Sequence, residues 1–185
     1  MKVLRHFVIF MKILRRRLWQ QGPLTTLRWL YGVGLPYLSG DLPLRFSRVT
    51  PNLYIGAQYG KRGRKRLVAE GINVSVNLRD EFDDADHDLH FMDYLYLPVV
   101  DNTAPSLDEL EQGVEFIQQH IAEGNKVYIH CKSGVGRAPT LTAAYLIAEG
   151  SSVEDALARI TTVRPFIRVL PDQLARLREF RALRQ

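Results

Sequence analysis

The chain has 185 residues, of which 46% are hydrophobic and 24% charged, and its net charge at pH 7 is +5. This length is ample for one α/β domain and short for two, and the composition is that of a folded globular protein. The single cysteine, Cys131, excludes an internal disulfide and is typical of a reducing, cytoplasmic compartment.

The positive charge is concentrated in the first third of the chain. Residues 1–66 contain 14 of the 25 lysine and arginine residues and one acid, Asp41. A nucleic-acid-binding protein would combine such charge with stacking aromatic residues on a folded face or with a known motif, and the sequence has neither. We therefore expect no nucleic-acid partner.

Residues 1–20 contain no acid and predict an amphipathic helix. Its apolar face comprises Leu4, Phe7, Met11, Leu14 and Leu18, and its basic face comprises Arg5, Lys12 and Arg16. The longest uninterrupted apolar run, Phe7–Met11, is too short to span a bilayer. The helix is therefore expected either to lie on an anionic membrane or to pack against the rest of the protein.

Residues 21–44 predict a hydrophobic connector broken by glycine and proline. The connector begins with Gly22-Pro23 and includes a candidate short helix over Leu24–Tyr31. We therefore expect two parts in the chain: a basic arm with its connector at 1–44 and a folded domain at 45–185. An anionic membrane surface is the expected partner of residues 1–38, which would place the protein in the cytoplasm or peripherally on a membrane.

Strand and helix patterns alternate through the second part. Short apolar or alternating runs predict strands over residues 72–78, 94–100 and 126–129. Amphipathic or buried patterns predict helices over residues 61–70, 106–123, 141–148, 152–163 and 171–184. This alternation predicts an α/β fold with a central, mainly parallel sheet flanked by helices.

Two charged segments lie within these elements. Lys61–Arg66 is a second basic cluster, and residues 79–88 form an acidic loop near His87 and His90. We interpret both as solvated surface; the alternatives are a lipid or phosphate contact for the basic cluster and a metal site for the acidic loop. The loop has no recognisable metal-ligand spacing, and we expect neither a metal nor a cofactor.

One stretch carries most of the chemistry, residues 130–137 with the sequence His-Cys-Lys-Ser-Gly-Val-Gly-Arg. It separates a buried strand from a buried helix, so the loop aims backbone N–H groups at one point over the helix N-terminus. The candidate phosphate-binding residues are Lys132, Ser133, Gly134, Val135, Gly136 and Arg137. The positive field, with His130 beside it, favours the thiolate of Cys131, which is the nucleophilic form.

The spacing of His130, Cys131 and Arg137 resembles the His-Cys-x5-Arg signature of cysteine-dependent phosphatases, and the surrounding chain is similar to their small dual-specificity branch. The other matching segments are Pro51–Gly56 (first strand), Leu97–Asp101 (general-acid loop), Arg164-Pro165 and Pro171–Leu174. The resemblance covers roughly residues 46–183 and implies the fold of that branch.

The resemblance also implies roles for individual residues. Cys131 would attack phosphorus to form a phosphocysteine intermediate, Arg137 would bind the phosphate, and Asp101 would protonate the leaving oxygen. His130 would support the thiolate. Gln173 would orient water near the cleft, although a surface position on its helix is an equal alternative.

Ala138 departs from the pattern of many family members, which have Ser or Thr directly after the arginine. That hydroxyl helps the thiolate to leave when the intermediate is hydrolysed. The phosphatases of regenerating liver share the Arg-Ala-Pro arrangement, so the departure is compatible with activity. We expect slow breakdown of the intermediate in this chain.

Three functions stay open at this point. The first is a phosphatase of proteins, acting on phosphotyrosine and also on phosphoserine or phosphothreonine. The second is a phospholipid head-group phosphatase acting on a phosphoinositide or phosphatidylglycerophosphate, which the basic arm and the Cys131-Lys132 pair favour and Val135 disfavours. The third is a membrane-tethered phosphate-binding module with little turnover, for which Ala138 is the only support.

Overall fold

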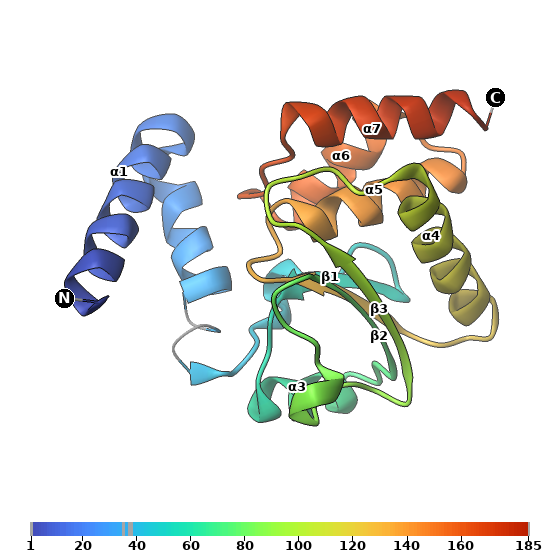
Figure 1. Cartoon of the computed structure of the whole chain (residues 1–185), viewed down its shortest axis with the longest axis horizontal. Coiled ribbons are helices and arrows are strands. Elements are labelled where there is room, and N and C mark those ends of the chain that lie inside the picture. The colour runs from blue at the N-terminus through green and yellow to red at the C-terminus, as the bar shows by residue number, and fades with distance from the viewer. Residues whose placement is uncertain (1, 35, 37–38, 185) are drawn as a thin grey trace.

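The computed structural model describes residues 2–34, 36 and 39–184 (Figure 1). The predicted arm and domain also include residues 1, 35, 37, 38 and 185, which lie outside this description. The side chains of residues 2–7 and 9, and with them Leu4, Arg5 and Phe7 of the predicted amphipathic helix, lie outside it as well.

The centre of the fold is a parallel sheet with the strand order β1-β4-β2-β3. In this order the strands are Leu53–Ala57 (β1), Val127–Cys131 (β4), Val74–Arg79 (β2) and Asp93–Val99 (β3). Because every neighbouring pair is parallel, the carboxyl ends of all four strands meet at one edge of the sheet. The predicted α/β fold with a central parallel sheet is confirmed.

Helices cover both faces of the sheet (Figure 1). One face packs against α4 to α7, and the other carries α3. Their bounds are Lys61–Ala69 (α3), Leu107–Ala122 (α4), Arg137–Ala148 (α5), Val153–Val163 (α6) and Pro171–Ala182 (α7). Helix α5 begins at Arg137, where the sequence placed the start of the helix, and the buried run at 141–148 forms its later turns.

Side-chain alternation explains why the two central strands are buried along almost their whole length. On β4, Val127 and Ile129 belong to the large core beneath α4 to α7, whereas Tyr128 belongs to the smaller core beneath α3. Strands buried on both faces read as continuous apolar runs. Strand β4 continues to Cys131, two residues beyond its predicted end, so the cysteine is part of the sheet.

The arm forms a helical hairpin. Helix α1 spans Lys2–Trp29 but is interrupted at Gly22, whose φ of 79° and ψ of 169° are not helical. The chain reverses there, and the two halves of α1 lie side by side (Figure 1). A π-helical turn follows over Leu30–Gly34. The predicted break at Gly22-Pro23 and the predicted short helix after it are both present, while the boundary at 44/45 stays a prediction.

Aromatic contacts hold the hairpin together and attach it to the domain. Trp29 stacks on Phe10 at 6.2 Å between ring centroids. Phe46 contacts Tyr31 at 6.2 Å and Phe166 at 5.8 Å. The arm therefore packs on the segment that precedes α7.

Gly32 allows the arm to lie close to Phe166 of the domain. A Cβ atom on Gly32 would lie 2.6 Å from the Phe166 ring, so a larger residue would separate the arm from the domain. Among the described residues, no helix is long and apolar enough to cross a membrane.

The second basic cluster is partly used inside the fold. Arg66 pairs with Asp41 at 2.7 Å, and Arg64 donates to the carbonyl of His90 at 3.2 Å. Lys61, Arg62 and Lys65 are exposed, so the predicted solvated surface describes half of the cluster.

Candidate active site

The carboxyl end of β4 joins the N-terminus of α5 through a loop of five residues, Lys132–Gly136. Cys131 ends the strand with 3% of its surface exposed, and Arg137 begins the helix with 1% exposed. The first N–H groups of a helix have no partner within the helix and carry its positive partial charge. The six residues predicted to bind phosphate therefore surround the helix N-terminus beside the cysteine.

The loop can close tightly because Gly134 has a φ of +62°, a conformation that L side chains rarely adopt. A Cβ atom at this position would also collide with the carbonyl oxygen of Gly56 on β1. Both constraints require glycine at position 134.

Arg164 fixes the direction of the loop peptides. Its Nε donates to the carbonyl of Gly134 at 2.6 Å, and its Nη2 donates to the carbonyl of Ser133 at 2.9 Å. In a trans peptide the C=O and N–H groups point in opposite directions. Two carbonyls held toward Arg164 therefore leave the N–H groups of Gly134 and Val135 directed away from it.

Burial lowers the pKa of Arg164 to about 10. The side chain still carries its positive charge at neutral pH, since this value lies well above 7. The sequence analysis placed Arg164 only in an Arg-Pro segment that resembles the family, and the support that Arg164 gives to the loop was missed. The presence of an arginine among the apolar residues of that segment could have indicated a buried, structural role for Arg164.

Arg137 is held from several sides. Its Nη1 donates to the carbonyls of Val99 at 2.8 Å and Leu78 at 3.1 Å, at the ends of β3 and β2. The same guanidinium contacts both oxygens of Glu81, at 3.0 and 3.2 Å, and Nη2 lies 3.1 Å from Asp101. Although burial alone would lower it, the pKa of Arg137 is raised by these acids and by the charge of Cys131.

Glu81 is a site residue that the sequence did not identify. It lies in the acidic loop that was interpreted as solvated surface, and this interpretation is wrong for part of the loop. Burial raises its pKa, but the hydrogen bonds that Glu81 accepts, from Arg137 first, and the charge of Arg137 together outweigh burial and hold the pKa well below its usual range. Glu81 therefore stays ionised and orients Arg137.

The same loop supplies the partner of His130. The Nε2 atom of His130 lies 2.8 Å from Oδ2 of Asp84, and both side chains are fully buried. Asp84 also accepts hydrogen bonds from Gln58 at 2.8 Å and Tyr59 at 3.1 Å. Burial raises the pKa of Asp84, but the charge of His130 and these hydrogen bonds lower it overall. The contact with Asp84 thus lies behind the histidine that precedes Cys131, while neither ring nitrogen makes a hydrogen bond within the described part of the chain.

Asp101 lies just beyond β3, with 58% of its side chain exposed and Oδ1 at 3.1 Å from Arg137. Its other oxygen accepts a hydrogen bond from Asn102 at 3.1 Å. The carboxyl group is thus in contact with solvent and with Arg137, the arginine predicted to bind phosphate. This position is compatible with proton transfer to a leaving group.

Gln173 is 1% exposed, so the alternative of a surface position is wrong. Its Nε2 donates to the carbonyl of Thr103 at 2.8 Å, and its Oε1 accepts from the N–H of Leu170 at 2.9 Å. A Cβ atom on Gly136 would lie 3.6 Å from the Gln173 amide, which places this side chain beside the loop. Gln173 ties the Asp101 segment to the start of α7, and its role toward water stays a prediction.

Comparison with known proteins gives this geometry a family. Residues 53–182 match the dual specificity phosphatase catalytic domain. The human phosphatidylglycerophosphatase and protein-tyrosine phosphatase 1 is 32% identical over 145 residues, which cover 73% of this chain and 72% of the relative. The phosphatidylglycerophosphate phosphatase PTPMT2 of Arabidopsis thaliana is 27% identical over 144 residues, or 75% of this chain and 63% of the relative.

A solved structure agrees with these relatives. The crystal structure of PTPMT1 in complex with PI(5)P superposes with a TM-score of 0.68 at 30% identity, covering 74% of this chain and 94% of that chain. Fold, family match and sequence identity all lead to the same conclusion. The chain belongs to the dual-specificity branch of the cysteine-dependent phosphatases.

Proposed function

We propose that this phosphatase hydrolyses the phosphomonoester of a phospholipid head group, with phosphatidylglycerophosphate as the first candidate. The observation that carries the proposal is the 32% identity to the human phosphatidylglycerophosphatase and protein-tyrosine phosphatase 1 over most of both chains. The sequence alone placed phosphorylated proteins first, and the relatives now favour the lipid alternative. Phosphotyrosine remains the second candidate because the name of the same relative includes that activity.

The proposed reaction has two steps. The Cys131 thiolate attacks phosphorus, the bond to the leaving oxygen breaks, and Asp101 gives that oxygen a proton. Asp101 then takes a proton from water, whose oxygen attacks phosphorus and releases Cys131 and inorganic phosphate. Arg137 and the loop amides stabilise the charge on the three remaining phosphate oxygens in both steps.

The arm supports a substrate that lies in a bilayer. Nine of the 13 exposed large hydrophobic side chains in the described part of the protein belong to the hairpin: Val8, Phe10, Met11, Ile13, Leu18, Trp19, Leu24, Leu27 and Tyr31. Three of them lie around the bend at Gly22, where Trp19 is 84%, Leu24 60% and Leu27 62% exposed. Apolar side chains next to arginines and without acids suit an anionic lipid surface.

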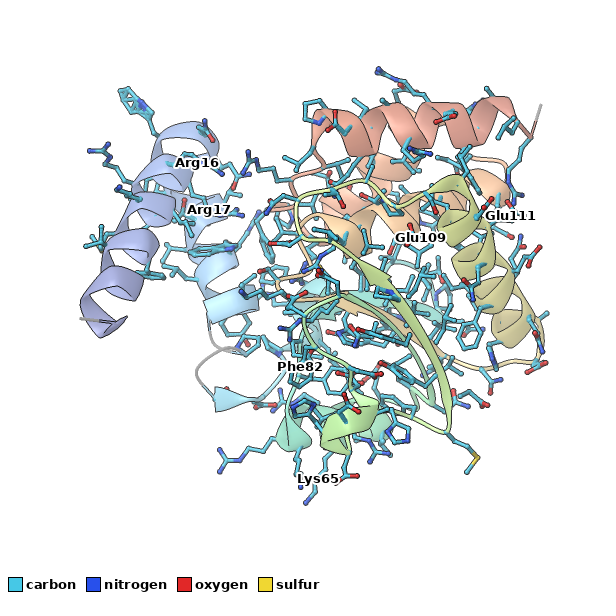
Figure 2. The ribbon with its side chains drawn as sticks, viewed as in Figure 1. Arg16, Arg17, Lys65, Phe82, Glu109 and Glu111 are labelled. Atoms are coloured by element: carbon cyan, nitrogen blue, oxygen red, sulfur yellow. The ribbon has the colours of Figure 1, made fainter. Side chains whose placement is uncertain are left out.

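The second basic cluster lies elsewhere. Figure 2 shows Lys65 on α3 at the lower end of the molecule, away from Arg16 on the arm. The hairpin is therefore the proposed membrane contact within residues 1–38. A cytoplasmic protein held peripherally on a membrane stays a prediction.

Substrate class is tested by comparing release of phosphate from phosphatidylglycerophosphate in vesicles with release from phosphotyrosine peptides. We expect a kcat/KM for the lipid at least ten-fold above that for the peptides, with activity that persists in chelator and disappears in Cys131→Ser. A preference for peptides would restore the protein-phosphatase hypothesis. Absence of turnover on every substrate, with tight phosphate binding, would favour the binding module.

The general acid is tested with leaving groups of different basicity. Asp101→Asn should lower kcat on an alkyl phosphate about 100-fold or more, because the alkoxide leaves only when protonated. Hydrolysis of a nitrophenyl phosphate should fall far less, since its leaving group is stable as an anion. The exposed Asp86→Asn in the acidic loop is the matched control, and equal losses on both substrates would remove Asp101 from this role.

Ala138 is tested by pre-steady-state kinetics. Its side chain is fully buried in the first turn of α5, next to Arg137. We expect a burst of leaving group followed by slow turnover, and a several-fold faster second step in Ala138→Ser. Ala143→Ser adds the same hydroxyl to a buried position of the same helix and should change neither phase. An unchanged second step in Ala138→Ser would contradict the proposed cause.

The membrane contact is tested by vesicle sedimentation of the full chain. Trp19→Ser combined with Leu24→Ser should weaken binding to mixed phosphatidylcholine and phosphatidylglycerol vesicles about ten-fold or more, because two large apolar side chains no longer leave water. Nitrophenyl phosphate hydrolysis should not change. The control, Val68→Ser combined with Met92→Ser, removes two exposed apolar side chains from the domain. Equal vesicle binding by the two double variants would exclude the hairpin as the membrane contact.

A further inference from the structure

Three arginines lie beside the active-site loop, two from the segment at 164–168 and one from the arm. Arg164 supports the loop as described above, and the N–H of Arg168 donates to the carbonyl of Val135 at 2.7 Å. Arg17 comes from the arm, and its Nη1 donates to the carbonyl of Phe166 at 3.3 Å (Figure 2). The segment from Arg164 to Arg168 therefore has the phosphate-binding loop on one side and the arm on the other.

Two of these arginines have free hydrogen-bonding groups. Arg164 uses Nε, Nη1 and Nη2 on the carbonyls of Gly134, Phe46 and Ser133. Within the described part of the chain, the side chain of Arg168 is exposed and makes no hydrogen bond or ion pair. Arg17 is half-buried, and its hydrogen bonds to Gln21 and Phe166 both come from Nη1.

The cluster has positive charge without a compensating acid. Burial, and after it the positive charges of Arg16, Arg168 and Arg164, lower the pKa of Arg17 to about 10. Some other surface arginines are paired with an acid, as Arg66 is with Asp41 at 2.7 Å. Like charges that crowd together without acids repel one another, and a bound anion removes that repulsion.

We propose that Arg17 and Arg168 form a second anion site, which binds the phosphodiester of a lipid whose phosphomonoester occupies the Cys131 loop. Guanidinium groups bind phosphate oxygens through paired, charge-assisted hydrogen bonds. The inference rests on the proposed lipid substrate and narrows it to head groups that carry two phosphates. Phosphatidylglycerophosphate has a phosphodiester one glycerol unit from its terminal phosphate, whereas phosphatidic acid has no second phosphate.

The position of the site explains why such a lipid would be favoured. The backbone of Arg168 is bonded to the loop at Val135, so its side chain starts at the rim of the catalytic pocket. Arg17 belongs to the hairpin that carries the exposed apolar side chains. A lipid with its terminal phosphate at Cys131 and its acyl chains toward the hairpin would pass between these two arginines.

The site is tested with short-chain, soluble lipids, which remove any effect of vesicle binding. Arg168→Gln and Arg17→Gln should each lower kcat/KM for dihexanoyl phosphatidylglycerophosphate about ten-fold or more through KM, since one charge-assisted contact is lost. The kcat/KM values for dihexanoyl phosphatidic acid and nitrophenyl phosphate should stay within about two-fold of wild type.

Two controls match the variants in charge. Arg28→Gln removes an exposed arginine from the arm, and Arg178→Gln removes one from α7. Both should leave the preference for phosphatidylglycerophosphate over phosphatidic acid unchanged. Because Arg17 contacts Phe166, the stability of Arg17→Gln is compared with that of wild type by urea unfolding. Arg168→Gln loses no side-chain hydrogen bond or ion pair among the described residues, so the test relies on this variant if Arg17→Gln is unstable.

A competition assay separates failure of this site from failure of the proposed substrate. Glycerophosphoglycerophosphate, the deacylated head group, should inhibit nitrophenyl phosphate hydrolysis, with a Ki that rises about ten-fold in Arg168→Gln. The Ki of glycerol phosphate should not change. If wild type hydrolyses no lipid yet these Ki values differ, the second site stands and the lipid function fails. If Arg168→Gln leaves lipid KM and head-group Ki unchanged, the site is overturned.

Discussion

The buried guanidinium of Arg137 is the constraint on which the rest of the site depends. A charge with 1% exposure is costly unless its hydrogen bonds are made within the protein. Carbonyls at the ends of β2 and β3 and the carboxylate of Glu81 meet that requirement for the two Nη atoms, whereas Nε is buried without a hydrogen-bond partner among the described residues. The ends of the strands, the acidic loop and the segment that carries Asp101 are therefore arranged around one side chain. The part of this side chain that these contacts do not use is available to a phosphate.

Three further buried side chains hold the loop, His130 and the Asp101 segment in place. Arg164 fixes two carbonyls of the loop, Asp84 fixes His130, and Gln173 fixes the segment that carries Asp101. Each of these side chains is buried and makes its hydrogen bonds to groups far away in sequence. Preorganised groups of this kind do not have to reorganise when charge develops in the transition state.

The sequence could predict those features that residues close together in the chain form. The strand, the cysteine, the glycine-containing loop and the arginine at a helix start are adjacent in the chain, and a single stretch therefore indicated nucleophile and phosphate site together. The same is true of the bend at Gly22-Pro23. By contrast, Glu81, Asp84 and Arg17 act through partners at least 46 residues away. An acidic loop looks solvated until the fold brings a buried arginine and histidine to it.

The surroundings of Cys131 have a consequence for oxidative damage. A cysteine at the electropositive N-terminus of a helix is prone to oxidation to sulfenic acid, which a disulfide with a neighbouring cysteine can resolve. This chain has one cysteine, and only 3% of its surface is exposed. Reduction must then come from an outside thiol that enters the pocket used by the substrate, and a bound substrate would shield the sulfur from both oxidant and reductant.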